Sequence, residues 1–417
     1  MKIEITAFDE RGKGLGDGYT VPFAYPGDQV EIEIVNHKKK LGKLTKVLNA
    51  SPHRQTPVCK HFGVCGGCSW QGLKYAEQVK IKEQVIRNLF ADTSPLISSP
   101  HEYFYRNRMD FAFGPDFTLG LKNQWDRIVD IEKCWLMSEE SNKILTRLKY
   151  FTQWKKLHKW KETKDGILRH AVIREGKFIN NNLVNILTAK GEFDLEELWE
   201  KMSDLARGLL WSINPSPADR SVGDIQKFIG QDYLEEKLGS VKFRIPAQSF
   251  FQTNSYQAVN LLEIIKKFAA LSGSEKVLEL YSGVGTIGLS LAHQAEEIIG
   301  VEENEEAVKD AVNNAMLNGI TNYSALAGRA EDMIEEFEYS FDIAIVDPPR
   351  PGIHKKVLNK LGEAQPDRII YVSCNPHSQK VDIDKLLPFG YKISAIQPLD
   401  LFPHTPHIEN VILLMSH

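Results

Sequence analysis

The stretch that decides the fold is residues 278–288, which read LELYSGVGTIG. An apolar run leads into closely spaced glycines, and the residues from Thr286 onward can open a helix. The glycines allow a tight turn and a close approach of the backbone to a ligand, while the N-terminus of the helix adds a positive potential. Glu302 ends the next apolar run, 19 residues after Gly283, where a carboxylate can accept both hydrogen bonds of a ribose diol. The stretch therefore predicts a site for a nucleoside-containing ligand at a strand end.

Alternating strands and helices surround this turn. A helix is expected over residues 256–270, and apolar strand-like runs follow at 276–280, 298–302, 341–346, 368–372, 392–396 and 411–414. Continuous apolar runs separated by helical segments imply βαβ units, with a parallel sheet covered on both faces. Dinucleotide dehydrogenases and S-adenosylmethionine methyltransferases both use a glycine turn of this kind, so the turn alone leaves the two classes open.

Residues 347–350, which read DPPR, separate these classes. They follow the apolar run 341–346, and their two prolines lack N–H groups and stiffen the exit of the strand. Asp347 is thereby placed at the ligand edge of the sheet, where it can contact the cofactor or an incoming base. A surface turn is the alternative interpretation. Dehydrogenases have no need of this tetrad, so it favours a methyltransferase.

Cys374 lies at the following strand end, in residues 373–376, which read SCNP. A thiolate there can act as a nucleophile, although a strand-end cysteine can also be a small buried hydrophobe. Its position one strand after Asp347 favours catalysis. Residues 404–409 read HTPHIE and precede the last strand. Glu409 can serve there as a general base, whereas His407 and Glu409 alone make an incomplete metal site.

Three of the five cysteines lie close together in the sequence. Cys59, Cys65 and Cys68 have the spacing C-x5-C-x2-C, and Cys134 is a remote fourth thiol. Four thiolates hold either zinc or a [4Fe–4S] cluster. Zinc ribbons usually show two paired knuckles, so three local ligands and one remote ligand favour iron–sulfur. The C-x3-C-x2-C spacing of radical S-adenosylmethionine enzymes is absent from this sequence.

Two segments have features of RNA-binding surfaces. Residues 1–50 alternate short β-like runs with glycine-rich turns, which suggests a small β-barrel of oligonucleotide-binding type. Lys38–Lys40 lies on a connecting segment that can meet phosphates. Residues 146–170 hold eight Lys and Arg against two Asp and Glu, with tryptophans between them. This mixture fits a phosphate backbone and stacked bases, but a solvated helix face is the simpler interpretation of the segment alone.

Composition sets wider limits on the class of protein. The 417 residues carry a formal net charge of −4, with 42% hydrophobic and 25% charged residues. This is an ordinary globular composition, which excludes collagen-like, low-complexity and globally disordered classes. No apolar run approaches the roughly 18 residues of a membrane span, and the first residues lack the features of a secretory signal. We therefore expect a cytoplasmic protein with no membrane partner, and by default a monomer.

Together these motifs resemble those of a known family. Further matching stretches are residues 59–71 (CKHFGVCGGCSWQ), 105–109 (YRNRM) and 250–254 (FFQTN). The chain resembles the bacterial RNA (uracil-5-)-methyltransferases, specifically the iron–sulfur branch that modifies 23S ribosomal RNA. The resemblance implies an α/β fold plus a small β-barrel. Its parts would be an OB-type, RNA-binding TRAM barrel (1–50), an α+β central domain with the cluster loop (51–250), and a class I, Rossmann-like methyltransferase domain (251–417).

The resemblance also implies roles for matched residues. Cys374 would be the nucleophile and Glu409 the base. The [4Fe–4S] cluster would be bound by Cys59, Cys65, Cys68 and Cys134, and S-adenosylmethionine by Gln252, Tyr281, Thr286, Glu302 and Asp347. Thr286 stands where some relatives have asparagine, and Glu279 stands where aspartate is common. Neither departure touches the chemistry, but the first leaves the individual contact from Thr286 open.

The implied reaction is methylation of C5 of a uridine in 23S ribosomal RNA. Cys374 would add to C6 of the ring, C5 would attack the methyl group of the sulfonium, and Glu409 would remove the C5 proton before the cysteine leaves. The target base must be flipped out or lie in a single-stranded loop. One alternative is the transfer RNA branch of the same superfamily, which we expect to lack the N-terminal barrel and the cysteine cluster. A catalytically silent RNA-binding assembly factor is another.

Overall fold

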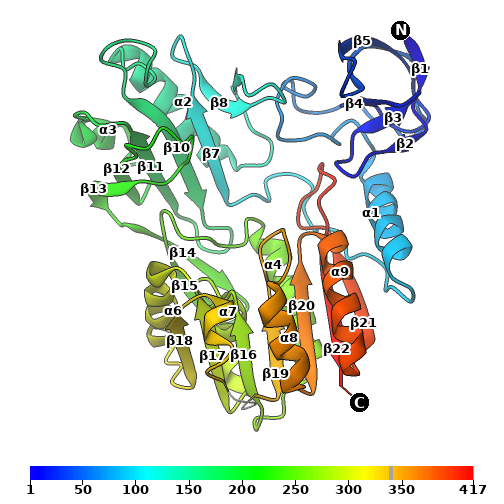
Figure 1. Ribbon diagram of the computed structural model, residues 1–417. Coiled ribbons are helices and arrows are strands. Elements are labelled where there is room, and N and C mark those ends of the chain that lie inside the picture. Colours follow the sequence, from blue (N-terminus) through cyan, green and yellow to red (C-terminus); the bar gives the residue numbers. More distant parts are fainter. Residues whose placement is uncertain (338–340, 417) are drawn as a thin grey trace.

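The described part of the chain forms three large β-sheets and a separate two-stranded hairpin (Figure 1). The computed structural model describes residues 1–337 and 341–416. The three sheets follow one another along the sequence. The N-terminal sheet has an apolar core of its own, whereas one core of the C-terminal sheet also includes Leu183 and Leu210 of the central sheet. Figure 1 shows the N-terminal and central sheets side by side above the C-terminal sheet.

The N-terminal sheet has six short strands in the order β1-β5-β6-β4-β3-β2. They are β1 (Lys2–Glu4), β2 (Ala7–Phe8), β3 (Gly14–Gly16), β4 (Tyr19–Val21), β5 (Gln29–Asn36) and β6 (Leu41–Asn49). Buried and more exposed residues alternate at the start of β5, where Val30 and Ile32 are buried in the core of this sheet. Lys38–Lys40 lies exposed on the turn between β5 and β6, as predicted.

The central sheet has the order β13-β12-β11-β10-β7-β8-β9, and only its β11–β12 pair is parallel. Its strands are β7 (Arg108–Phe113), β8 (Leu119–Lys122), β9 (Ile128–Asp130), β10 (Leu168–Glu175), β11 (Asn182–Thr188), β12 (Gly208–Ile213) and β13 (Asp224–Gly230). Helices α2 (Glu139–Trp154) and α3 (Leu195–Met202) pack their apolar sides on it. Ser138 and Asp194 cap the N-termini of these helices through side-chain oxygens. The hairpin of β14 (Tyr233–Leu238) and β15 (Val241–Pro246) follows.

The C-terminal sheet has the order β18-β17-β16-β19-β20-β22-β21. Its strands are β16 (Lys276–Leu280), β17 (Glu297–Glu302), β18 (Tyr323–Ala327), β19 (Ile343–Val346), β20 (Arg368–Ser373), β21 (Lys392–Leu399) and β22 (Glu409–Met415). The helices are α1 (Tyr75–Leu89), α4 (Ser255–Ala269), α5 (Thr286–Leu291), α6 (Glu305–Leu317), α7 (Ala330–Met333), α8 (Lys355–Ala364) and α9 (Pro376–Leu386), with 3₁₀ turns at Ala292–Gln294 and Leu387–Phe389.

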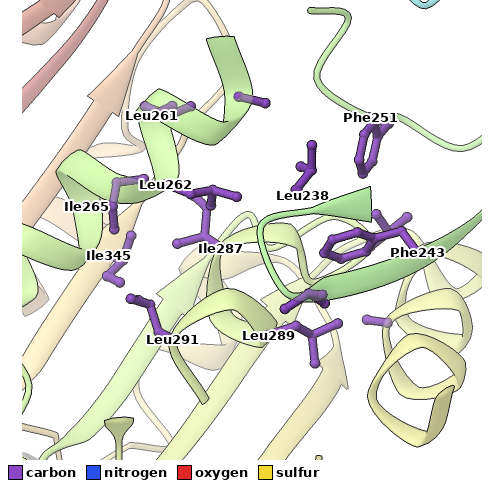
Figure 2. Close-up of a cluster of buried hydrophobic side chains, with 14 of the residues drawn as sticks. Leu238, Phe243, Phe251, Leu261, Leu262, Ile265, Ile287, Leu289, Leu291 and Ile345 are labelled. Atoms are coloured by element: carbon purple, nitrogen blue, oxygen red, sulfur yellow. The ribbon is translucent and has the colours of Figure 1, made fainter. Parts of the chain in front are cut away.

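Helices cover this sheet on both faces, as predicted. Ile343 and Ile345 of β19 lie in one core with α4, α5 and α6, whereas Ala344 and Val346 lie in a second core with α1, α8 and α9. Figure 2 shows part of the first of these cores, which includes Leu261 of α4, Ile287 of α5 and Phe243 of β15. Because β19 is buried on both faces, its sequence is continuously apolar rather than alternating.

Two features of the sheet differ from the sequence-based expectation. The strand β18 was not predicted, because residues 323–327 lack a continuous apolar run. The sheet is not wholly parallel either, since β22 pairs antiparallel with both β20 and β21. The short connection between β21 and β22 holds no crossover helix, so these two strands must run in opposite directions.

Candidate active site

The strand ends of the C-terminal sheet bring the predicted catalytic residues together. In the antiparallel pair of β20 and β22, Val372 lies opposite Val411, and Ser373 lies opposite Asn410. Continuing this register by one residue places Cys374 opposite Glu409. Asp347 follows β19, which is the neighbour of β20 on its other side. The end of one strand and the start of an antiparallel strand thus meet at the same edge of the sheet.

The glycine turn forms a pocket beside this edge. Gly283 donates its backbone N–H to Glu302 Oε2 at 3.0 Å, so the acid of the next strand fixes the turn. Tyr281 has a φ of 64°, in the left-handed region, which turns the chain sharply out of β16. Four of the five predicted cofactor residues, Gln252, Tyr281, Thr286 and Asp347, line this one pocket, and Glu302 borders it through Gly283. Gln252 Nε2 lies 3.5 Å from Asp347 Oδ2.

Burial raises the pKa values of Asp347, Glu409 and Cys374, and mutual repulsion adds to the shifts of Glu409 and Cys374. Burial raises the pKa of Asp347 to about 7. Burial, and then the charge of Asp347, raise the pKa of Glu409 well above its usual range. Burial, followed by Glu409 and Asp347, raises the pKa of Cys374 to about 11, and Arg350 opposes this shift. The thiol therefore stays protonated near neutral pH unless a neighbouring group takes its proton.

The two histidines of residues 404–409 have different surroundings. His407 Nδ1 lies 3.5 Å from Arg350 Nη2, and burial together with Arg350 lowers the pKa of His407 to about 4. His404 instead faces Gln78, with 3.1 Å between His404 Nδ1 and Gln78 Nε2. Across residues 1–337 and 341–416, no three His, Cys, Asp or Glu side chains are grouped so that they could hold a metal ion.

Glu279 is a buried acid at the pocket, and its sequence context assigned it no role. Glu279 Oε2 accepts the backbone N–H of Gly288 at 3.0 Å, and a Cβ added at Gly288 would lie only 2.5 Å from that oxygen. Burial raises the pKa of Glu279 to about 8. Glu279 thus ties the strand before the glycine turn to the helix after it. The available signal was an acidic residue inside an otherwise apolar strand.

A second set of contacts missed by the sequence analysis holds the connection between β21 and β22. Trp70, which follows the cysteines, donates its backbone N–H to the His404 carbonyl at 2.9 Å. Gln78 Oε1 accepts the backbone N–H of His404 at 2.8 Å. Lys82 Nζ lies 2.7 Å from Asp400 Oδ1, and both side chains are fully buried. The segment that leads to Glu409 is therefore packed against residues more than 300 positions earlier in the chain.

The four predicted cluster cysteines line one cavity of about 280 Å³ between the cysteine loop and the central sheet. Cys134 is anchored by its backbone N–H, which donates to Asn142 Oδ1 at 2.7 Å. Burial raises the pKa of Cys134 to about 12 and that of Cys68 well above its usual range. Arg106, Lys122 and Lys133 line the same cavity. The cavity therefore combines four thiols with positively charged side chains.

Over residues 74–417 the chain matches the family described as tRNA (Uracil-5-)-methyltransferase. It belongs to this family. A tRNA (uracil(54)-C(5))-methyltransferase of Pyrococcus horikoshii is 40% identical over 420 residues, which cover 100% of both chains. A 23S rRNA (uracil(747)-C(5))-methyltransferase of the same organism is 36% identical over 421 residues, which cover 100% of this chain and 99% of the relative.

A solved structure of a relative has a similar fold over the full length of the chain. The crystal structure of Pyrococcus abyssi tRNA (uracil-54, C5)-methyltransferase in complex with S-adenosyl-L-homocysteine has a TM-score of 0.86 and 34% identity to this chain, and the match covers 100% of each. The predicted membership among the RNA (uracil-5-)-methyltransferases is confirmed, and so is a mixed α/β methyltransferase fold. Within the described residues, no helix is both long and apolar enough to cross a membrane.

Proposed function

We propose that this protein transfers the methyl group of S-adenosylmethionine to C5 of a uridine in RNA. The observation that carries the proposal is the β20–β22 register, which brings a thiol opposite a buried carboxyl group beside the glycine-turn pocket. C5 of uracil is a poor nucleophile. Methylation at this carbon needs a group that adds to the ring and a base that later removes a proton from C5. Methyl transfer to an oxygen or an exocyclic amine would not need the cysteine.

In the proposed mechanism the Cys374 thiol gives its proton to solvent, and the resulting thiolate adds to C6 and pushes electron density to C5 through an enolate. C5 then displaces the methyl group from the sulfonium. Glu409 takes the proton from C5, the bond between C6 and sulfur breaks, and the aromatic ring is restored. Holding both reactants makes methyl transfer effectively unimolecular, and such orientation can lower a barrier by about 7–11 kcal/mol. The raised pKa of Glu409 suits a group that must hold a proton during this cycle.

The remaining site roles are part of the same proposal. S-adenosylmethionine is bound by Gln252, Tyr281, Thr286, Glu302 and Asp347. This role is supported by the pocket that four of them line and by the S-adenosyl-L-homocysteine in the related crystal structure. We further propose that residues 1–50 act as a TRAM-type RNA-binding barrel, 51–250 as the central domain and 251–417 as the methyltransferase domain. The protein would act as a monomer.

We propose that Cys59, Cys65, Cys68 and Cys134 hold a [4Fe–4S] cluster. Their common cavity supports this, and its cationic lining suits a cluster whose four thiolates give it net negative charge. Thiolates around a four-iron cluster lie further apart than those around one ion, which is compatible with the lack of a single-ion site in the described parts of the chain. Anaerobically purified protein should contain iron and sulfide and absorb visible light. The Cys68→Ser variant should lose the iron, the sulfide and the absorption. Stoichiometric zinc in place of iron would contradict the cluster.

Two RNA targets are supported for the site. The sequence favours a 23S rRNA target on the expectation that transfer RNA enzymes lack the N-terminal strands and the cysteine segment. However, a relative named as a tRNA enzyme aligns with this chain over its whole length, so that reason no longer separates the targets. Its 40% identity, against 36% for the 23S rRNA enzyme, favours tRNA as the first substrate to test. Methyl incorporation into purified tRNA and 23S rRNA transcripts decides between them.

The covalent step gives the test of the proposed function. With labelled S-adenosylmethionine, the protein should place 5-methyluridine in one of these RNAs. RNA containing 5-fluorouridine should trap a covalent complex, because fluorine at C5 cannot be removed as a proton. Cys374→Ser should form no complex. A Cys374→Ser variant that methylates RNA at the parent's rate would refute the mechanism, and a parent that traps no RNA would favour a silent binding factor.

A further inference from the structure

The segment of residues 141–161, in α2 and the turn after it, is rich in positive charge. It contains seven Lys and Arg and no Asp or Glu. Acidic side chains outside the segment pair with four of these cations, because Lys143 pairs with Glu140, Arg147 with Asp204, Lys149 with Asp130 and Lys155 with Glu197. Within the described residues, Lys156, Lys159 and Lys161 have no acidic partner. These three lysines remain available to a polyanion.

Two large aromatic rings are exposed on the same helix. Tyr150 is 70% exposed and Trp154 is 52% exposed. Arg147, Tyr150 and Trp154 are spaced by three and four residues, which places them on one face of α2. This face borders an open groove of about 550 Å³, and Glu200 and Lys201 of α3 line its other side. We call these four residues the α2 aromatic face.

The fold does not require these rings. The opposite side of α2 supplies its core contacts through Ile144, Leu145 and Leu148, which are fully buried. The rings of Trp154 and Phe151 pack edge to face, with 6.3 Å between their centroids. Lys155 and Lys201 lie over the Trp154 ring, at 4.8 and 5.9 Å from its centroid. Flat rings flanked by cations are typical of surfaces on which unpaired bases stack while their phosphates meet lysines.

We propose that the α2 aromatic face binds unpaired nucleotides of the RNA substrate outside the active site. The inference rests on the proposed function, because it takes RNA as the partner. The excess of cations favours a nucleic acid over a protein with a mixed surface. Figure 1 shows α2 and α3 beside the central sheet, on the side of the molecule away from the N-terminal sheet. Nucleotides beyond the target loop can therefore contact this face while the target uridine occupies the strand-end site.

The test compares a full-length RNA with its isolated target stem–loop. The RNAs are tRNA and a 23S rRNA fragment, and binding is measured for both whether or not the parent protein methylates them. The double variant Tyr150→Ala, Trp154→Ala should bind the full-length RNA at least ~10-fold more weakly, because each lost stack is worth about 1–3 kcal/mol. It should methylate the isolated stem–loop at the parent's rate. The single variant Trp154→Phe should keep most of the parent's affinity for the full-length RNA, since a phenyl ring can still stack.

Met316→Ala provides the matched control, because Met316 is 72% exposed on α6, away from this face. It should bind both RNAs like the parent. Equal affinity of the double variant and the parent for full-length RNA would overturn the inference, as would an equal loss of binding to the isolated stem–loop. A parent that binds RNA through this face but forms no 5-methyluridine would instead refute the proposed function.

Discussion

At the scale of single residues, the reaction depends on one thiol and one carboxyl group with separate tasks. Glu409 acts only after methyl transfer, so Glu409→Gln should leave the bond between Cys374 and C6 intact. Turnover should fall by about 10²–10⁴-fold, the usual contribution of a general base. A methylated protein–RNA complex should then accumulate on ordinary RNA and appear as a slower band on a denaturing gel. Cys374→Ser serves as the control without a band, and rapid turnover by Glu409→Gln would assign the base elsewhere.

The proton affinity of Cys374 gives a second prediction for single residues. Burial raises the pKa of Cys374 most, and the charges of Glu409 and Asp347 raise it further, to about 11, because a second negative charge beside a carboxylate is unfavourable. Removing one carboxylate must lower that pKa. The rate of thiol alkylation in the absence of RNA should rise with pH, and Asp347→Asn should move its midpoint to lower pH. Arg350→Gln should move it to higher pH, and identical profiles would show that these charges do not act on the thiol.

At the scale of secondary-structure elements, Glu279 makes the junction of β16 and α5 sensitive to pH. Its folded pKa of about 8 exceeds the usual value of 4.5, so the folded state binds the proton more tightly than the unfolded state. The stability linked to this group is present below about pH 4.5 and is lost as the pH rises through 8, by up to about 1.4 kcal/mol per pH unit. Glu279→Gln should therefore gain stability over the parent between pH 5 and 8 in chemical denaturation. A constant difference across this range would contradict the linkage.

The helix α1 is joined to the β21–β22 connection by the buried ion pair of Lys82 and Asp400. Lys82→Met leaves a buried carboxylate without its partner, which should cost about 3–5 kcal/mol. The double variant Lys82→Met, Asp400→Asn should recover most of this loss, because no uncompensated charge remains. Thermal unfolding of the two variants and the parent measures the difference. Equal melting temperatures for the single and double variants would show that charge is not the cause.

The sequence predicts best those helices and strands whose apolar pattern lies within a few neighbouring residues. The apolar runs of β16, β17, β19 and β20 and the helix α4 could be read from neighbouring residues, because strands buried on both faces must be continuously apolar. The strand β18 lies at the edge of the sheet and is only partly buried, so its sequence carries no such signal. The direction of β22 depends on a connection without a helix, which the apolar pattern alone does not reveal.

At the scale of the whole molecule, the sequence identified the motifs but not the contacts between the parts. Cys374, Asp347 and Glu409 could be brought to one edge because each lies at a strand end. The hydrogen bond from Trp70 to His404 joins the cysteine-bearing segment to the β21–β22 connection, and no periodicity links residues so far apart. The buried pair of Lys82 and Asp400 was missed for the same reason, since its members are separated by 318 residues.

The salt dependence of RNA affinity tests whether the N-terminal sheet contributes to RNA binding. Lys38, Lys39 and Lys40 are exposed on the β5–β6 turn, and each can displace a counterion from one phosphate. Replacing all three with Gln should weaken RNA binding and flatten the plot of log affinity against log salt by about 2–3 units, at about 0.7–0.9 per phosphate contact. The control replaces Lys267 and Lys276, at the edge of the C-terminal sheet opposite the active site, and should keep the parent's slope. If both variants keep that slope, the turn does not meet phosphates, and RNA must be held by the central and C-terminal sheets alone.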